Sequence, residues 1–186
     1  MKSEHDVFAE VIEILEKLKI PYMIGGSVAS IAYGEPRLTL DMDVVVDIGL
    51  QQVGSFAGSF GPEYYVSLES IQDAIRNRSH FNIIQSEVGV KVDFYVLNQD
   101  TFSQEEFKRK GRQAFDENRT AVFATPEDTI IKKLEWHKMG ESQKHLEDIR
   151  GILKISSNKL DVKYIDKWSL KLEVFDIWQK LKSESL

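Results

Sequence analysis

Three aspartates are the residues of this chain whose spacing could do chemistry. Asp41 and Asp43 stand two residues apart in an apolar run, and Asp93 lies between Val92 and Phe94 in another. On a β-strand, residues two apart point to the same face, so the carboxylates of Asp41 and Asp43 would emerge together. Two carboxylates at such a short distance repel each other unless a divalent cation lies between them. The pattern therefore predicts that Asp41, Asp43 and Asp93 bind Mg²⁺ or Mn²⁺.

Such a cluster suits the transfer of a nucleotidyl group. When a hydroxyl attacks the alpha phosphate of a nucleoside triphosphate (NTP), charge develops on the attacking and leaving oxygens, and two metal ions can stabilise both. Asp41 and Asp43 would bridge the ions, while Asp93 would bind the ion at the attacking hydroxyl and accept its proton. The alternative is a set of structural ion pairs, with Arg37 as the expected partner.

A glycine pair and a serine, Gly25-Gly26-Ser27, precede the first aspartate strand. Residues 22–24 read as a short buried strand, and Ser27 is a suitable N-cap for a short helix after the turn. The free N–H groups and the positive dipole end of such a helix favour phosphate, and glycine allows a close approach. Alone, the tripeptide is typical of plain turns. Its position before the aspartate strand favours phosphate binding.

The composition is that of a globular protein. The chain has 186 residues, of which 42% are hydrophobic and 29% charged, with no cysteine and a net charge of −6. No apolar run approaches the about 20 residues that a membrane span needs, and the lack of cysteine excludes disulfides and thiolate zinc sites. We expect a cytoplasmic protein without a membrane span. The negative charge disfavours a surface that holds nucleic acid mainly through its phosphates.

The apolar periodicity predicts a sheet domain followed by helices. Strands are expected over residues 22–24, 38–48, 81–84 and 90–97, and helices over residues 7–18, 28–32, 67–78, 128–139, 143–153, 162–168 and 170–181. Thr125 is expected to cap the first helix of the second half, with Pro126 at its first position. We divide the chain into a core, residues 1–120, and a C-terminal helical region, residues 121–186, that closes a cleft.

In three motifs the chain resembles the DNA polymerase beta nucleotidyltransferase superfamily. The motifs are Gly25-Gly26-Ser27, Asp41-Met42-Asp43-Val44 and Val92-Asp93-Phe94. The resemblance implies an α+β nucleotidyltransferase fold, α/β-like in character, with a mixed sheet flanked by helices. It also implies that the glycine pair and Ser27 bind the triphosphate and that the aspartates bind metal.

A looser resemblance covers nearly the entire chain. Its motifs are Tyr33-Gly34-Glu35-Pro36-Arg37-Leu38-Thr39-Leu40-Asp41, Thr125-Pro126-Glu127-Asp128-Thr129-Ile130-Ile131-Lys132-Lys133-Leu134-Glu135-Trp136 and His145-Leu146-Glu147-Asp148-Ile149. They are similar to small stand-alone nucleotidyltransferases related to abortive-infection (AbiEii-type) toxins. The resemblance implies that the helical half supplies Lys133 and Asp148 to the active site, that Arg37, Thr39 and Lys133 contact the NTP, and that an antitoxin could be a partner.

Helical geometry separates Lys133 from its neighbour Lys132. Lys133 borders the apolar face of its predicted helix, whereas Lys132 points away from that face. Lys133 would then reach the cleft, or its ammonium would extend to water with only its stem on apolar surface. Asp148 would join Lys133, or it would pair with Arg150 or Lys144.

The remaining aromatic and imidazole side chains suggest little chemistry. The four histidines show no metal-ligand spacing. Trp136, Trp168 and Trp178 fall at helical core spacing, so we expect them in the core rather than as stacking platforms for bases.

The sequence thus favours a metal-dependent nucleotidyltransferase that moves a nucleoside monophosphate from an NTP to a hydroxyl acceptor. The acceptor would be RNA, such as a tRNA 3′ end, a protein or a small molecule. One alternative is a non-catalytic nucleotide-binding or toxin–antitoxin interaction module. The other is an antibiotic adenylyltransferase, which would need an acidic wall for a cationic sugar. The candidates for that wall are Glu127, Asp128, Glu135 and Glu141.

Overall fold

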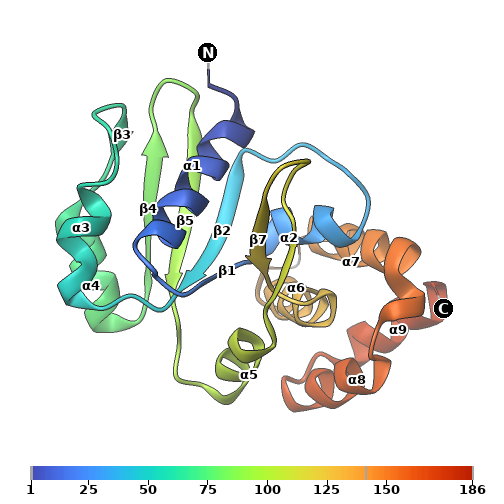
Figure 1. Cartoon of the computed structure of the whole chain (residues 1–186). Coiled ribbons are helices and arrows are strands. Elements are labelled where there is room, and N and C mark those ends of the chain that lie inside the picture. Colours follow the sequence, from blue (N-terminus) through green and yellow to red (C-terminus); the bar gives the residue numbers. More distant parts are fainter. Residues whose placement is uncertain (1, 141, 186) are drawn as a thin grey trace.

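Helices and strands alternate in the first part of the chain and helices alone follow, as Figure 1 shows. The computed structural model describes residues 2–140 and 142–185. The strands are β1 (Tyr22–Ile24), β2 (Asp41–Val46), β3 (Tyr64–Tyr65), β4 (His80–Gln85), β5 (Val90–Val96), β6 (Gly111–Ala114) and β7 (Thr120–Phe123). The helices are α1 (Glu4–Lys17), α2 (Gly26–Tyr33), α3 (Val53–Ala57), α4 (Leu68–Asn77), α5 (Thr101–Arg109), α6 (Pro126–Gly140), α7 (Gln143–Ser156), α8 (Val162–Lys171) and α9 (Phe175–Ser185), with 3₁₀ turns η1 (Leu50–Gln52) and η2 (Ser157–Lys159).

The seven strands form one mixed sheet in the order β3-β4-β5-β2-β1-β7-β6. Two neighbouring pairs are parallel, β2 with β5 and β1 with β7, and the other pairs are antiparallel. The mixed sheet, the hairpin of β4 and β5 and the C-terminal helices agree with the predicted α+β class. Strands β3, β6 and β7 and helix α5 were not predicted. In the part of the chain that the structure describes, no helix is long and apolar enough to cross a bilayer.

The two faces of the sheet differ because side chains alternate along each strand. In β2, Met42, Val44 and Val46 are buried in the main hydrophobic core, which also contains the apolar faces of α1, α3 and α4. Figure 1 shows α1 lying across the sheet over β5 and β2. Asp41 and Asp43 point to the opposite face, where α5 and α6 lie. The alternation alone therefore puts the aspartates outside the main core.

The C-terminal helices have a second hydrophobic core. Buried side chains of α6, α7, α8 and α9 form it, together with Phe102 of α5. Figure 1 shows α7, α8 and α9 grouped beside α2 and α6. Tyr33 of α2 packs against both cores, and its hydroxyl donates to the carbonyl of Ala124 at 2.8 Å. Helix α2 thus joins the helices to the sheet. The boundary after residue 120 stays a prediction.

Local signals account for the start of α6 but not for the break between α8 and α9. The Thr125 hydroxyl accepts from the Asp128 N–H at 3.2 Å, as expected of an N-cap. The helix predicted to begin at Leu170 is wrong at its start: α8 continues to Lys171 and α9 begins at Phe175. Glu173 adopts a left-handed conformation, with φ of 57°, and the turn places Val174 in the second core. Tertiary burial decides this boundary.

Candidate active site

Asp43 and Asp93 lie opposite each other on adjacent strands. The parallel register of β2 and β5 pairs Asp43 with Asp93 and Asp41 with Lys91. Neighbouring strands are about 4.8 Å apart, so the two carboxylates share one small area of the sheet. Asp93 is 9% exposed and Asp43 is half-buried, whereas Asp41 is exposed at the start of β2. The structure therefore brings two of the three predicted aspartates together in the interior of the site.

The glycine turn is built against Asp43. The Gly25 N–H donates to the Asp43 carbonyl at 2.9 Å. Gly26 has a φ of 56°, and a Cβ at this position would overlap the Asp43 carboxylate. Glycine favours this left-handed conformation, and its missing side chain leaves the space that the Asp43 carboxylate occupies. Gly25 is the N-cap of α2 and makes no side-chain capping bond, so the prediction of Ser27 as the cap was wrong. The α2 N-terminus and the aspartate pair form one continuous site.

Burial and like charge act on the aspartate pair. Burial raises the pKa of Asp43 above its ordinary value, and the nearby Asp93 carboxylate raises it further. On the other side, the Lys91 ammonium lies 2.7 Å from Asp93. That hydrogen bond raises the pKa of Lys91. The pair thus carries excess negative charge that one lysine only partly offsets.

This donor set fits a hard divalent cation. Magnesium is commonly held by one or two carboxylates together with substrate phosphates rather than by a closed protein cage. Asp43 and Asp93 offer two such carboxylates next to a helix N-terminus suited to phosphate. Among the described residues no three acidic, histidine or cysteine side chains converge as a metal-binding group. Metal binding by Asp43 and Asp93, with Asp41 as a third ligand, stays a prediction.

A second charged cluster lies beside Ser27. The Lys133 ammonium donates to Asp148 at 2.5 Å, and Arg37 donates to the two oxygens of Asp148 at 2.8 and 3.0 Å. Arg37 also donates to the Ser27 hydroxyl at 2.6 Å. Of the alternatives for Asp148, the structure thus has the pair with Lys133, while Arg150 pairs with Glu184. Four segments meet here: α2, the loop before β2, α6 and α7.

The burial of this cluster makes its charges interdependent. Lys133 is 1% exposed, so it does not extend to water as one interpretation had it. Burial by itself would raise the pKa of Asp148, but the hydrogen bonds from Arg37 and Lys133 outweigh it and hold that pKa below the ordinary value. Lys133 is also close enough to Asp43 to oppose the rise of its pKa. The two clusters therefore belong to one electrostatic site.

Arg37 and Thr39 have other hydrogen-bond partners than those predicted for them. Arg37 does not pair with the three metal-candidate aspartates, as the structural alternative required, because Asp148 and Ser27 bind it instead. The Thr39 hydroxyl donates to the Asp41 carbonyl at 3.1 Å. Its contact with an NTP stays a prediction.

A cavity of about 240 Å³ extends from the glycine turn along the face of β2 and β5. Gly25, Gly26 and Asp43 border it, and α5 and α6 cover it. Its walls include Tyr95, Glu106, Lys132 and Trp136. Trp168 and Trp178 are in the second core as predicted. The prediction that Trp136 belongs to the core was wrong, because its side chain is half-buried and lines the cavity.

Sequence reasoning missed Glu106. It is 4% exposed, and burial raises its pKa to about 8. Phe102 and Glu106 are four residues apart in α5, so they share one side of the helix. That spacing, with the buried Phe102, is the signal that could have identified Glu106 as an inward-facing acid.

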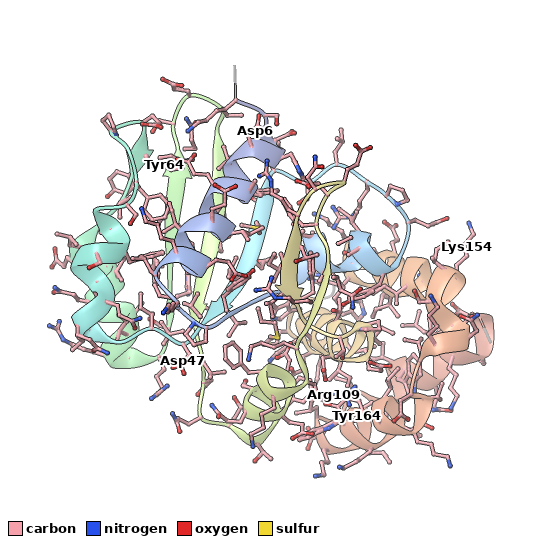
Figure 2. The ribbon with its side chains drawn as sticks, in the orientation of Figure 1. Asp6, Asp47, Tyr64, Arg109, Lys154 and Tyr164 are labelled. Atoms are coloured by element: carbon pink, nitrogen blue, oxygen red, sulfur yellow. The ribbon has the colours of Figure 1, made fainter. Side chains whose placement is uncertain are left out.

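The predicted acidic wall is not formed by Glu127 and Asp128. Both side chains are buried and pair with Arg109, at 3.2 and 3.1 Å. The Tyr164 hydroxyl also donates to Asp128, at 2.7 Å. Figure 2 shows Arg109 beside Tyr164, and the guanidinium stacks on that ring at 3.8 Å. These acids instead fix α5 and α8 to α6. Glu135 pairs with Lys132, and Glu141 lies outside the described residues.

No family model matches this sequence, and no curated protein matches it either. Solved structures match in fold. The antibiotic-resistance factor ANT(2'')-Ia matches with a TM-score of 0.61 at 12% identity, over 97% of this chain and 96% of that one. The lincosamide antibiotic adenylyltransferase LnuA, bound to lincomycin, matches with a TM-score of 0.54 at 14% identity, over 84% of this chain and 99% of that one.

A third structure is an antigenic nucleotidyltransferase-like protein from Paracoccidioides brasiliensis. It has a TM-score of 0.56 and 18% identity, over 96% of this chain and 92% of that one. The chain therefore has an α+β nucleotidyltransferase-like fold, with a mixed seven-stranded sheet and a C-terminal helical region. This confirms the predicted fold class.

Proposed function

We propose that this protein is a metal-dependent nucleotidyltransferase that transfers a nucleoside monophosphate from an NTP to a hydroxyl acceptor. One observation carries the proposal: the in-register pair of Asp43 and Asp93 directly borders a glycine turn at a helix N-terminus. A carboxylate pair for cations and a helix N-terminus for phosphate are the two parts that such chemistry needs. The shared fold of known nucleotidyltransferases supports the same function.

Different residues of the site bind the triphosphate and the metal ion. The α2 N-terminus, with the N–H of Gly26, binds the triphosphate, since the N–H groups of Gly25 and Ser27 already bind Asp43. Arg37 donates to the Ser27 hydroxyl of this turn, and together with Lys133 and Asp148 it forms a cluster with one net positive charge that offsets phosphate charge. Asp43 and Asp93, with Asp41 at the strand start, hold the divalent cation, which when bound offsets the charge on the reacting phosphate.

The chemical step follows from these positions. The acceptor oxygen forms a bond with the alpha phosphorus, and the bond from that phosphorus to the bridging oxygen of pyrophosphate breaks. Asp93 accepts the proton of the acceptor hydroxyl. Pyrophosphate leaves along the α2 N-terminus, where the glycine turn supplies N–H donors.

The acceptor classes are RNA, including a tRNA 3′ end, a protein hydroxyl and a small molecule. The resemblance of residues 33–41, 125–136 and 145–149 to nucleotidyltransferases related to abortive-infection toxins favours RNA or protein as acceptor and an antitoxin as partner. The fold shared over nearly the full length with ANT(2'')-Ia and LnuA favours the second candidate function, adenylylation of an antibiotic hydroxyl. Since Glu127 and Asp128 are buried in ion pairs, that function would depend on other acids.

Nucleotide incorporation tests this proposal. The protein is incubated with each alpha-labelled NTP, magnesium or manganese, and one of four acceptors: total RNA, total protein, tobramycin or lincomycin. We expect label on one acceptor class, and a loss of at least about 100-fold in Asp43→Asn, since metal-based charge stabilisation is worth several kcal/mol. Asp47→Asn, a change at an exposed aspartate past the end of the same strand, is the matched control. Equal incorporation by wild type and Asp43→Asn would refute the assignment, and tight NTP binding without incorporation would favour the non-catalytic module.

A further inference from the structure

A buried carboxyl group without a hydrogen-bond partner lines the cavity beside Asp43. Glu106 is 4% exposed, and among the described residues no hydrogen bond or ion pair to its carboxyl is found. Lys132, the cation whose charge acts most strongly on Glu106, forms its ion pair with Glu135 at 3.1 Å. The carboxyl oxygens of Glu106 are not fully enclosed by protein, so they reach the space of the cavity. An acid that has no protein partner and reaches a cavity can bind a ligand there.

The position of Glu106 is fixed from both sides of α5. Phe102 packs in the second core with its ring 4.9 Å from that of Trp168. Phe107 packs on the sheet face against Met23 and Leu97. With a side chain anchored in each core, the helix cannot turn Glu106 out of the cavity without losing both contacts. The packing of α5 thus fixes the position of the Glu106 carboxyl group in the cavity.

The surroundings of Glu106 favour its neutral form. Burial is the main cause of its raised pKa, at about 8. Among the charged groups that act on it, Lys132 of α6 lowers its pKa, whereas Asp128 and Glu135 of α6 and Asp100 before α5 raise it. At neutral pH the group is therefore a carboxylic acid that can donate one hydrogen bond and accept another.

The walls of the cavity suit a flat ring. Tyr95 and Trp136 line it, with ring centroids 6.5 Å apart, and base stacking on such side chains is a general mode of nucleotide recognition. Its volume of about 240 Å³ is far larger than the roughly 10–15 Å³ that one water molecule needs in the same measure, which leaves room for a one- or two-ring base. Gly26 and Asp43, beside which the reacting phosphate would lie, also line the cavity.

We propose that this cavity binds the base of the NTP and that Glu106 pairs with its amino edge, which favours adenine and cytosine over guanine and uracil. This rests on the proposed function. The acid O–H donates to the basic ring nitrogen, and the carbonyl oxygen accepts from the adjacent amino group. Guanine and uracil carry an N–H at that ring position, so the acid O–H would have to use their less basic carbonyl. Glu106 is thus the specificity residue for the base.

Equilibrium binding of ATP, CTP, GTP, UTP and inorganic tripolyphosphate in magnesium, at pH 7, tests the inference. We expect wild type to bind ATP and CTP at least about fivefold more tightly than GTP and UTP, the lower end for one bidentate base contact. Glu106→Met should abolish this preference. Glu106→Gln, which keeps a donor and an acceptor, should retain it. Glu105→Gln, a change in the same helix away from the cavity, should behave as wild type.

The pH dependence of ATP affinity distinguishes base recognition by Glu106 from a purely structural role, which would not change that affinity with pH. As the pH rises above about 8, the affinity of wild type for ATP should fall, because the carboxylate then faces the ring nitrogen, while the affinity of Glu106→Gln stays constant. Identical NTP preferences in wild type and Glu106→Met, with all four still bound, would overturn the base pocket and leave the proposed function standing. Binding of neither NTP nor tripolyphosphate by wild type would overturn the proposed function itself.

Discussion

Replacing Asp148 by asparagine is expected to destabilise the protein by about 3 kcal/mol. The side chains of Lys133 and Asp148 are 2% and 6% exposed, so the substitution leaves a buried ammonium without its counter-charge. Removing one partner of a buried pair typically costs about 3–5 kcal/mol. Arg37 is 26% exposed and can turn to water, which places the estimate at the lower end. For a chain of this length the melting temperature should fall by about 6–12 °C.

Urea unfolding followed by tryptophan fluorescence measures this loss. The double variant Lys133→Met/Asp148→Leu should recover most of it, because apolar residues of similar volume can replace a buried ion pair at little cost. Since the pKa of Asp148 is lowered in the folded state, its contribution is present above the ordinary carboxyl pKa and is lost as the pH falls through the folded value. The deficit of Asp148→Asn should therefore shrink in acid. A loss below about 1 kcal/mol at pH 7 would refute the buried-charge reasoning.

Two further changes test the turn and the cavity. Gly26→Ala should lower the free energy of unfolding by about 1–3 kcal/mol and weaken NTP binding, because the added Cβ would meet Asp43 at a left-handed φ. Gly54→Ala, at an open helical position, should be neutral or stabilising in the same urea titration. Because the pKa of Glu106 rises from 4.5 to about 8 on folding, its contribution to stability is fully present below 4.5 and is lost as the pH rises to about 8, by roughly 1.4 kcal/mol per unit. Unfolding free energies measured from pH 5 to 8 should decline less in Glu106→Gln, and parallel curves would contradict a protonated Glu106.

Strand periodicity was enough to predict which face of the sheet carries the aspartates, but not which strands would be neighbours. Asp43 could be placed on the polar face from the alternation of β2 alone. That β5 pairs with β2 in parallel, with Asp93 opposite Asp43, depends on long-range packing of both strands against α1. From the sequence we predicted only that the three aspartates share a metal site, and not that β2 and β5 are neighbours.

Helix α6 shows why periodicity predicted the helices of the second half but not the direction of every side chain on them. Its residues from Glu127 to Ile131 are all buried, because α6 contacts three other helices, α2, α7 and α8. A helix buried on several sides has no single apolar face from which directions can be read. Of the two alternatives left open for Lys133, the structure has the buried one, whereas Trp136 was assigned to the core although it lines the cavity. The edge strand β6 was missed because three of its four residues are exposed.

Asp43 is the residue at which the parts of the site meet, and this restricts what the site can bind. The glycine turn lies against one side of it, Asp93 is its partner across the strands, and the cavity begins beside it. A ligand that uses all three would need a phosphate chain toward α2, a flat ring toward Glu106 and a reactive phosphorus between them. An NTP has this outline, whereas inorganic polyphosphate would reach only the turn. Comparing tripolyphosphate with ATP therefore separates the contribution of the turn from that of the cavity in a single titration.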